Sequence, residues 1–237
     1  MDKINFVNLV RISHLDGLSK FMDNLREYIN KLRHDFMKMS LEENNVAVNA
    51  IVQFESWFRQ AVEGNAHEPN AFVLSTVGAD QRPSARIVLL RDFDETGFVF
   101  YTNYNSRKSR EIEANPFASM TFFWPELERQ VRVEGKLMKQ SAAASDSYFN
   151  ARPRSSQLGA WASPQSDSLP SRSVLDTALA EMEKRFEGKP VPRPEWWGGF
   201  VLQPDKIEFW QGRPNRLHDR LLYERAGFEW KISRLAP

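Results

Sequence analysis

The chain has 237 residues, of which 41% are hydrophobic, so it can bury a core as one large domain or two small ones. Its 32 lysines and arginines nearly balance its 31 aspartates and glutamates, whereas proteins that bind nucleic acid or an anionic membrane usually carry a basic excess. The absence of cysteine excludes disulfides and thiolate sites and is typical of the reducing cytoplasm. With no apolar run of about 18 residues and no metal-ligand spacing among the histidines, we predict neither a membrane span nor a metal site.

Two helices are predicted before the first strand. A helix over residues 18–36 is indicated by apolar residues that recur at intervals of three and four, namely Leu25, Ile29, Leu32 and Phe36. A second helix is predicted over Ala50–Glu63, because Asn49 is suited to cap its first turn. The apolar stripe of this helix consists of Ile51, Phe54 and Phe58.

From residue 71 the pattern changes to short apolar runs separated by turn signals such as Gly78-Ala79-Asp80 and Pro125. These runs predict strands over residues 71–77, 84–90, 97–103, 117–124 and 127–138. Short strands joined by tight turns favour an antiparallel sheet that curls into a barrel or a sandwich. The expected fold class is therefore mainly β with flanking helices, an α+β domain without an internal linker.

The remainder of the chain mixes helices, a long loop and further strands. Helices are predicted over residues 106–114, 141–151 and 173–186. The segment from Ser155 to Pro170 is rich in Ser, Gln and Pro and is predicted to be a loop, either disordered or functional. A strand is predicted after residues 196–199, and two more around residues 221–223 and 228–232.

Cationic residues gather at two places in the first half of the chain. Ser106-Arg107-Lys108 would put two cations and free backbone N–H groups at a helix start, which suits a phosphate but is also common on solvated surfaces. The strand from Arg86 to Arg91 carries an arginine at each end, either to reach water or to serve a site. Because residues five apart face opposite sides of a strand, one site for both requires a bulge, a twist or two chains.

A dense polar cluster follows the apolar run from Ile207 to Trp210 and the turn at residues 212–214. Beyond the turn Arg216, His218 and Arg220 alternate, so a regular strand would project all three from one face. Cations are costly to bury without anionic partners. The cluster is therefore either a solvated edge strand or a pocket for an anion or a polar ring.

Ten short motifs occur in the order found in pyridoxamine 5′-phosphate oxidases, and the chain resembles that family from about Met22 to Pro237. No single motif is decisive, but ten in register are specific. The motifs are Arg86 to Arg91, Phe100-Tyr101-Thr102-Asn103, Ser106-Arg107-Lys108, Glu128-Arg129-Gln130-Val131, Tyr148-Phe149, Arg152-Pro153-Arg154, Ser156-Gln157, Trp196-Trp197-Gly198-Gly199, Glu208-Phe209-Trp210-Gln211-Gly212 and Arg216-Leu217-His218-Asp219-Arg220.

The resemblance implies an antiparallel, FMN-binding split β-barrel that forms a homodimer with FMN at the subunit interface. The implied enzyme is cytoplasmic and oxidises pyridoxamine or pyridoxine 5′-phosphate to pyridoxal 5′-phosphate, reducing dioxygen to hydrogen peroxide, in vitamin B6 biosynthesis and salvage. Both FMN and the substrate carry a phosphate of about −2 charges, so such a site needs cations at two separate points.

The resemblance also implies roles for individual residues. Those that match FMN contacts are Arg86, Ile87, Val88, Leu89, Tyr101, Thr102, Arg107, Lys108, Gln130, Gln165, Ser166, Trp210 and Arg220. Those that match the substrate pocket are Arg33, Arg91, Tyr148, Arg152, Ser156, Arg216 and His218. Arg216 and His218 hold the pyridine ring against the flavin and are the expected catalytic residues. Because the substrate carbon becomes cationic as hydride leaves, we assign Arg216 a clamping role and His218 a hydrogen bond, with His218 as a general base left open.

Two departures from the family pattern concern the substrate. Arg91 replaces the usual Lys, which keeps the charge but exchanges a point charge for a fork. Arg33 matches the family's N-terminal arginine, but Phe36 replaces the tyrosine three residues on and lacks its hydroxyl. Residues 1–21 precede the resemblance and are expected to be dispensable, with residues 22–237 as the single oxidase domain.

Two other classes of protein remain open. The first is a split-barrel protein that binds flavin or pyridoxal phosphate without oxidase activity, because a fold does not fix a function. The second is a nucleic-acid module built on Arg129, Arg132, Lys136 and Lys139. The glutamates at 126, 128 and 134 interleave with these cations and disfavour the second class.

Overall fold

The computed structural model describes residues 24, 25, 27–29, 31, 36 and 38–237, and the chain divides into two units, Met1–Phe36 and Met37–Pro237. In the first unit the described residues from 24 to 31 are helical, as the sequence pattern predicts, but most of the helix expected over residues 18–36 lies outside the described residues. The predictions for residues 1–21 and for Arg33 also lie outside them. Everything below concerns the second unit.

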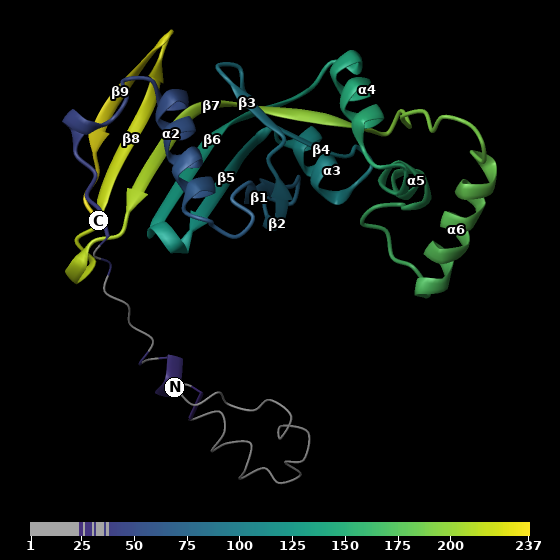
Figure 1. The fold of residues 1–237 in the computed structure, drawn as a ribbon, viewed down its shortest axis with the longest axis horizontal. Coiled ribbons are helices and arrows are strands. Elements are labelled where there is room, and N and C mark those ends of the chain that lie inside the picture. Colours follow the sequence, from purple (N-terminus) through teal and green to yellow (C-terminus); the bar gives the residue numbers. More distant parts are fainter. Residues whose placement is uncertain (1–23, 26, 30, 32–35, 37) are drawn as a thin grey trace. The chain divides into compact units, whose positions relative to one another are not determined.

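One antiparallel sheet of nine strands forms the second unit (Figure 1). Its strands are β1 Ala71–Val77, β2 Pro83–Leu89, β3 Asp92–Asp94, β4 Gly97–Asn103, β5 Phe117–Trp124, β6 Arg129–Lys139, β7 Trp197–Gln211, β8 Asp219–Ala226 and β9 Glu229–Arg234. The main path runs β2-β1-β5-β6-β7-β4-β3, and β8 and β9 extend it from β7. The terminal strands β2 and β3 do not pair with each other, so this described sheet stays open, as in a split barrel.

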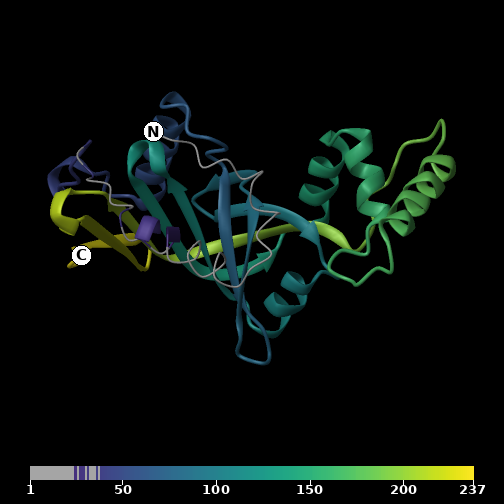
Figure 2. The ribbon, with the colours of Figure 1, turned by 90° about the horizontal axis from the view of Figure 1, so that it is seen from below.

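Five α-helices flank the sheet: α2 Ala50–Glu63, α3 Arg107–Ala114, α4 Ala142–Ala151, α5 Arg154–Ala162 and α6 Arg172–Arg185. Helices α4 to α6 lie together beyond one end of the sheet, and β8 and β9 lie at the other end, in both views (Figures 1 and 2). One-turn 3-10 helices occur at Glu43–Asn45, Pro125–Leu127 and Pro214–Arg216. No helix among the described residues combines the length and apolar character needed to cross a membrane.

Helix α2 has the predicted bounds and covers the inner face of the sheet. The side chain of Asn49 accepts hydrogen bonds from the backbone N–H groups of Ile51 and Val52, at 2.7 and 3.3 Å, which confirms its capping role. Phe54 is fully buried, and its ring meets those of Phe93 and Phe98 edge-on, with centroids 4.9 and 4.8 Å away.

The strands of the core alternate in burial as their sequence predicts. In β1 every second residue, Phe72, Leu74 and Thr76, is buried against the core. A smaller hydrophobic core, separate from the main one, lies at the end of the sheet and contains Phe149, Leu158, Phe186, Val191 and Trp197. This smaller core packs α4 to α6 against the beginning of β7.

The prediction of a loop from Ser155 to Pro170 is wrong for the first half of this segment, which forms helix α5. Its Ser and Gln residues are typical of loops, but Leu158 and Gln157 are buried, and packing overrides weak local propensity. Arg154 at its first position donates hydrogen bonds to the backbone oxygens of Phe186 and Lys189, which joins α5 to the end of α6.

The strand predicted to carry Arg216, His218 and Arg220 on one face is also wrong. Strand β8 begins only at Asp219, and Arg216 ends a 3-10 turn with a left-handed φ of 62°. Pro214 has no N–H for a strand ladder, and left-handed residues turn the chain, so a regular strand cannot start before the turn is complete.

Candidate functional site

The beginning of α3 gathers cations from two elements. Helix α3 follows β4 after three residues and brings Arg107 and Lys108 close to Arg86 of the edge strand β2. The ammonium of Lys108 donates to Thr102 Oγ1 at 3.1 Å and to Gln165 Oε1 at 3.0 Å. The structure thus brings together five residues that the family resemblance assigns to FMN. We call Arg86, Thr102, Arg107, Lys108 and Gln165 the first cluster.

Lys108 has no carboxylate within ion-pair distance in the described part of the chain. Burial lowers its pKa to about 8, the nearby charge of Arg86 adds to this effect, and Glu111 opposes it. A buried cation that holds its proton only weakly is better satisfied by an anion than by the neutral oxygens around it. The first cluster therefore suits a phosphate.

Glu111 lies beneath the first cluster, and the sequence analysis did not find it. Its Oε1 accepts from Arg107 Nε at 2.7 Å, and its Oε2 accepts from Arg86 at 3.0 Å. Thr76 and Ser84 donate their hydroxyls to the same Oε2, each at 2.6 Å. On a helix surface, glutamate four residues after arginine is an ordinary pair, and nothing in the sequence indicates that this one is buried.

A stack of aromatic rings forms a second cluster, where α4 meets β4 and β7. The rings of Tyr101 and Tyr148 lie 3.8 Å apart and 5° from parallel, and Trp197 continues the stack 5.6 Å from Tyr101. The guanidinium of Arg152 lies over Trp197, 4.5 Å from the ring centre. Burial lowers the pKa of Arg152, and the neighbouring charge of Arg91 lowers it further.

Arg152 keeps one nitrogen for a partner from outside the chain. Its Nη1 is buried and has no hydrogen-bond partner among the described residues. A guanidinium nitrogen without a hydrogen-bond partner is a candidate for binding an anion. Arg91 and Tyr148, which the resemblance assigns to the substrate phosphate, lie nearby, and Ser156 is half-buried in the first turn of α5.

The two arginines of the β2 segment serve different clusters. Arg86 faces α3 and Glu111, whereas Arg91 lies beyond the end of β2 and close to Arg152. The chain turns at the buried Leu90, and the backbone N–H of Arg91 donates to Val99 of β4 at 2.9 Å. Arg86 and Arg91 therefore face different clusters, and no bulge is needed to bring them to one site.

A third cluster lies at the other end of β7. The register places Gln130 of β6 beside Trp210 of β7, and Trp210 beside Arg220 of β8. The His218 ring lies 4.6 Å from that of Trp210, and Arg220 is bound to Glu208 at 2.8 Å. This cluster contains three expected flavin contacts and one of the two expected catalytic residues. The other, Arg216, lies close enough to affect the charge of His218.

His218 is held as a hydrogen-bond donor. Its Nδ1 accepts the backbone N–H of Arg213 at 3.1 Å, so the neutral ring carries its proton on Nε2. Burial lowers the pKa of His218, and the charge of Arg216 lowers it further, which favours the neutral ring at pH 7. A neutral imidazole with Nε2–H can donate to a substrate oxygen but cannot accept a proton at that nitrogen.

The third cluster is far from the first two in the same chain. Tyr101 pairs with Gly199 near the start of β7, and Trp210 is eleven residues further on. At about 3.3 Å per residue the strand spans roughly 35 Å between them, which is longer than an FMN molecule. Figure 1 shows β7 running along the sheet from the end near α4 to the end beside β8. The remaining expected FMN contacts are residues 87–89 on the edge strand β2 and Ser166 beside Gln165.

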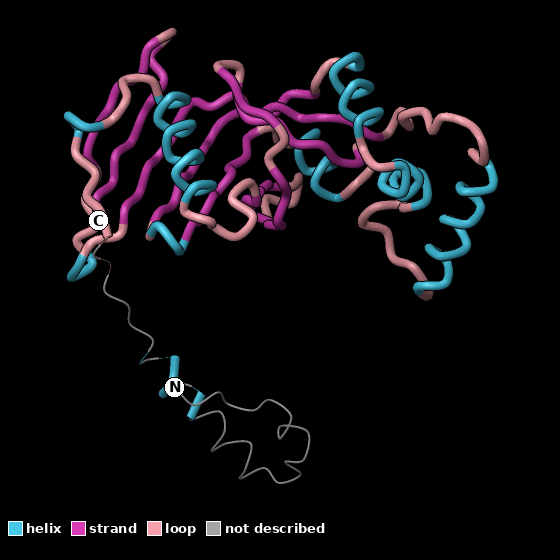
Figure 3. The backbone as a smooth tube through the Cα atoms, in the orientation of Figure 1, coloured by secondary structure: helices cyan, strands magenta, loops and turns pink. Residues whose placement is uncertain are grey.

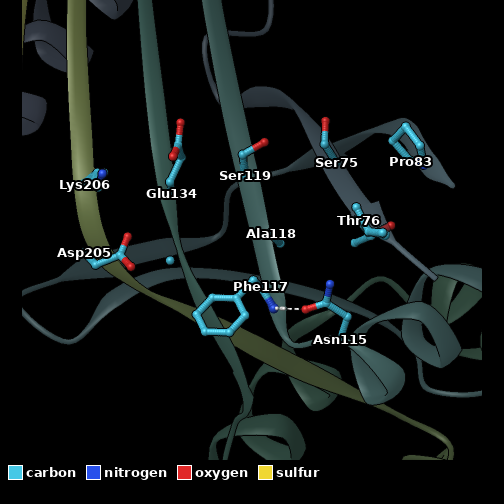
Figure 4. Close-up of a pocket in the computed structure, with 12 residues that line it drawn as sticks. Ser75, Thr76, Pro83, Asn115, Phe117, Ala118, Ser119, Glu134, Asp205 and Lys206 are labelled. Atoms are coloured by element: carbon cyan, nitrogen blue, oxygen red, sulfur yellow. Dashed lines mark hydrogen bonds between the residues drawn. The ribbon is translucent and has the colours of Figure 1, made fainter. Parts of the chain in front are cut away.

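An open groove of about 380 Å³ on β1, β5, β6 and β7 contains none of the expected site residues (Figure 4). Its lining includes the carboxylates of Glu134 and Asp205 as well as Lys206. Two carboxylates beside one ammonium make this groove unsuitable for a phosphate dianion.

Comparison with known proteins agrees with this geometry. Residues 58–186 match the family model described as pyridoxamine 5′-phosphate oxidase. The chain belongs to the pyridoxamine 5′-phosphate oxidase family. Residues 197–237 match the model described as a pyridoxine 5′-phosphate oxidase C-terminal dimerisation region, which contains Trp210, His218 and Arg220. The third cluster, apart from Gln130 of β6, therefore lies in the part of the chain that matches a dimerisation region.

The match to curated relatives extends over nearly the whole length of each relative. The chain is 58% identical to a pyridoxine/pyridoxamine 5′-phosphate oxidase of Rubrobacter xylanophilus, over 87% of this chain and 95% of that protein. It is 50% identical to the enzyme of the same name from Acaryochloris marina, over 91% of this chain and 99% of the other.

Solved structures agree on the fold. PhzG from Burkholderia lata, in complex with tetrahydrophenazine-1-carboxylic acid, is 31% identical, with a TM-score of 0.80 over 86% of this chain and all of that chain. A pyridoxamine 5′-phosphate oxidase-related, FMN binding protein from Nostoc punctiforme has a TM-score of 0.64 at 19% identity, over 84% of this chain and all of that chain, and supports the fold alone.

Gly199 is required by the aromatic stack. A Cβ at this position would lie 2.8 Å from the Tyr101 ring and 3.0 Å from the Gln140 side chain. We expect Gly199→Ala to displace Tyr101 and to lower the free energy of unfolding by about 1–3 kcal/mol, measured by urea denaturation of the flavin-free protein. The matched control is Gly159→Ala in α5, where the added Cβ meets nothing within 4 Å and alanine favours the helix. Equal stability of the two variants would contradict the packing argument.

Proposed function

We propose that this chain is a cytoplasmic, FMN-dependent oxidase that converts pyridoxamine and pyridoxine 5′-phosphate to pyridoxal 5′-phosphate in vitamin B6 biosynthesis and salvage. The observation that carries the proposal is the presence of two separate cation clusters, one around Lys108 and one around Arg152, each with a group that has no anionic partner among the described residues. A cofactor and a substrate that each bear a phosphate require two such clusters. The family membership supports the same reaction.

We further propose that two copies of the chain complete each site. Tyr101 and Trp210 both match flavin contacts, but β7 separates them by roughly 35 Å, so one FMN cannot touch both in one chain. In a homodimer the first two clusters of one copy can meet the third cluster of the other. The match to a dimerisation region, which contains Trp210, His218 and Arg220 of the third cluster as well as Arg216, supports this arrangement.

The roles of the residues follow from their contacts. Arg86, Arg107 and Lys108 bind the FMN phosphate, and Gln130, Trp210 and Arg220 of the other copy contact the flavin. Arg152 binds the substrate phosphate through its free Nη1, with Arg91, Tyr148 and Ser156. Arg216 clamps the pyridine ring, and His218 donates from Nε2 to a ring substituent.

FMN held by these residues would supply the hydride acceptor, with dioxygen as the final oxidant and hydrogen peroxide as its product. The substrate loses a hydride and a proton from its 4′ carbon and the attached group. With the amine, water then replaces nitrogen and ammonia leaves. Since the geometry makes His218 a donor, its part is to orient the ring rather than to take this proton.

A peroxide assay on the purified, FMN-loaded protein with each substrate tests the reaction. We expect one peroxide for each pyridoxal phosphate formed. Bound FMN without peroxide from either substrate would contradict the proposal and favour a flavin-binding protein that is not an oxidase.

Replacing Arg107 and Lys108 together by Ala tests the phosphate assignment. Each charge-assisted hydrogen bond is worth about 1.5–3 kcal/mol, so we expect the FMN Kd to rise by about a hundredfold or more, measured by quenching of flavin fluorescence. Arg110→Ala is the matched control, because it removes a cation from the exposed side of the same helix. A double variant that binds FMN as tightly as the control would show that this helix start is only a solvated surface.

The lowered pKa of Lys108 predicts a pH dependence of FMN binding. The empty site keeps the Lys108 charge below a pH of about 8 and loses it above. Since the phosphate prefers the protonated ammonium, the FMN Kd should rise between pH 7 and pH 9.5, with proton uptake on binding in that range. Calorimetry in buffers of different ionisation enthalpy measures the uptake. In Lys108→Met the Kd should be higher throughout and lose this pH dependence.

Arg216→Ala and His218→Ala test the substrate side. Arg216→Ala should keep FMN bound but lower kcat/KM by about a hundredfold or more, because the pyridine ring is no longer aligned for hydride transfer. His218→Ala should be milder, because a donor that orients a ring contributes less than an essential base. A collapse of kcat in His218→Ala with an altered pH profile would instead make His218 the base. Full activity of Arg216→Ala would overturn the clamping role.

A further inference from the structure

Glu111 is the acceptor for four side chains of the first cluster and its surroundings. Its carboxylate is only 7% exposed, and both oxygens are used: one by Arg107, and the other by Arg86, Thr76 and Ser84. Burial alone would raise the pKa of Glu111, but the hydrogen bonds from Ser84, Thr76, Arg107 and Arg86 outweigh it and lower the pKa to about 2. The group is therefore an anion at any physiological pH.

A carboxylate beneath a phosphate site has two opposite effects. It neutralises one cation, which weakens the attraction for a phosphate dianion. It also fixes the direction of the cations that it holds. Arg107 is the side chain that most needs this support, because it is 61% exposed and donates only through Nε to Glu111 among the described residues. Its two terminal nitrogens make no hydrogen bond among the described residues, so both can donate to a ligand.

Resting on the proposed FMN site, we propose that Glu111 is a positioning residue, which aims Arg86 and Arg107 at the flavin phosphate and is itself fixed by the hydroxyls of Thr76 and Ser84. The three cations and this carboxylate leave two net positive charges, which balance a phosphate dianion. Without Glu111 the cluster would have three net positive charges. The affinity for phosphate would gain little from the third charge, because Arg86 and Arg107 would no longer be held in place and would lose conformational entropy on binding.

The fixed neighbours of Glu111 make it a rigid anchor. Thr76 belongs to the central strand β1, and Ser84 lies directly opposite it on β2. Arg86 on β2 donates in addition to the backbone oxygen of Leu74, at 3.2 Å. The anchor thus connects the start of α3 to two paired strands, so the cations from helix and strand keep one relative position before any ligand binds.

Two substitutions separate aiming from neutralisation. Glu111→Gln keeps the shape of the side chain and removes its charge, and Glu111→Asp keeps the charge but withdraws it by one methylene. We expect the FMN Kd to rise about tenfold or more in Glu111→Gln and by a smaller factor in Glu111→Asp, measured by flavin fluorescence on the flavin-free protein. Glu113→Gln, an exposed glutamate of the same helix, is the control for the change in net charge.

If Glu111 only neutralises charge, Glu111→Gln binds FMN more tightly and Glu111→Asp binds as the parent does, and either result would overturn the proposal. A second pair of variants keeps the carboxylate and removes its supports. Thr76→Val with Ser84→Ala removes the hydroxyls that donate to Glu111 and that also accept hydrogen bonds from Arg86, so it should raise the Kd about threefold or more without changing any charge. An unchanged Kd would contradict the anchor. These variants also answer the question if Glu111→Gln fails to fold, which circular dichroism would reveal.

A double-mutant cycle with Arg107→Ala separates this proposal from the FMN site itself. If Glu111 acts through Arg107, Glu111→Gln should cost much less affinity in the Arg107→Ala background than in the parent. Equal costs in both backgrounds would refute the positioning of Arg107. An Arg107→Ala variant that binds FMN normally would instead refute the assigned phosphate site, so the two failures give different results.

Discussion

The continuous pairing of β7 is the constraint on which the other features depend. This strand, Trp197–Gln211, pairs with β6 along most of its length, and on its other edge it pairs first with β4 and then with β8. Such a strand cannot shorten or fold back without breaking two ladders of hydrogen bonds. The Tyr101 and Trp210 ends of the molecule therefore keep their separation, and no motion within one chain can join the clusters. The second copy proposed above would bring these clusters together in one site.

The cations of the first cluster make the empty protein less stable than it could be. Burial of the Lys108 ammonium without a counter-ion disfavours its charged form, as the lowered pKa records. An anion that binds here offsets the unfavourable free energy of burying this charge. Binding of the cofactor and folding stability are therefore linked. The same argument explains why the cluster is not simply neutralised: a second carboxylate would stabilise the empty protein and remove the affinity for phosphate.

Local patterns predicted most elements of the sheet, because alternation and turn residues are local signals: β1, β4, β5 and α2 have the predicted bounds. Helix α5 was missed, since its stability comes from burying Leu158 rather than from its Ser-rich sequence. The resemblance supplied the members of the clusters and assigned Arg86 to FMN and Arg91 to the substrate, but it did not give the turn at the buried Leu90 that separates the two arginines. Glu111 was missed because only the tertiary contacts with Thr76 and Ser84 distinguish it from a surface glutamate.

The two clusters proposed to bind phosphate hold their cations by different means. In the first cluster a carboxylate directs two arginines, and a third cation restores the charge that the carboxylate removes. In the second cluster Arg152 lies over the ring of Trp197 and, like Arg91, has no ion pair among the described residues. An aromatic face orients a guanidinium without cancelling its charge, so two arginines there already match a phosphate dianion. Arg152 therefore depends on the aromatic stack for its direction, and the stack depends on the bare backbone of Gly199.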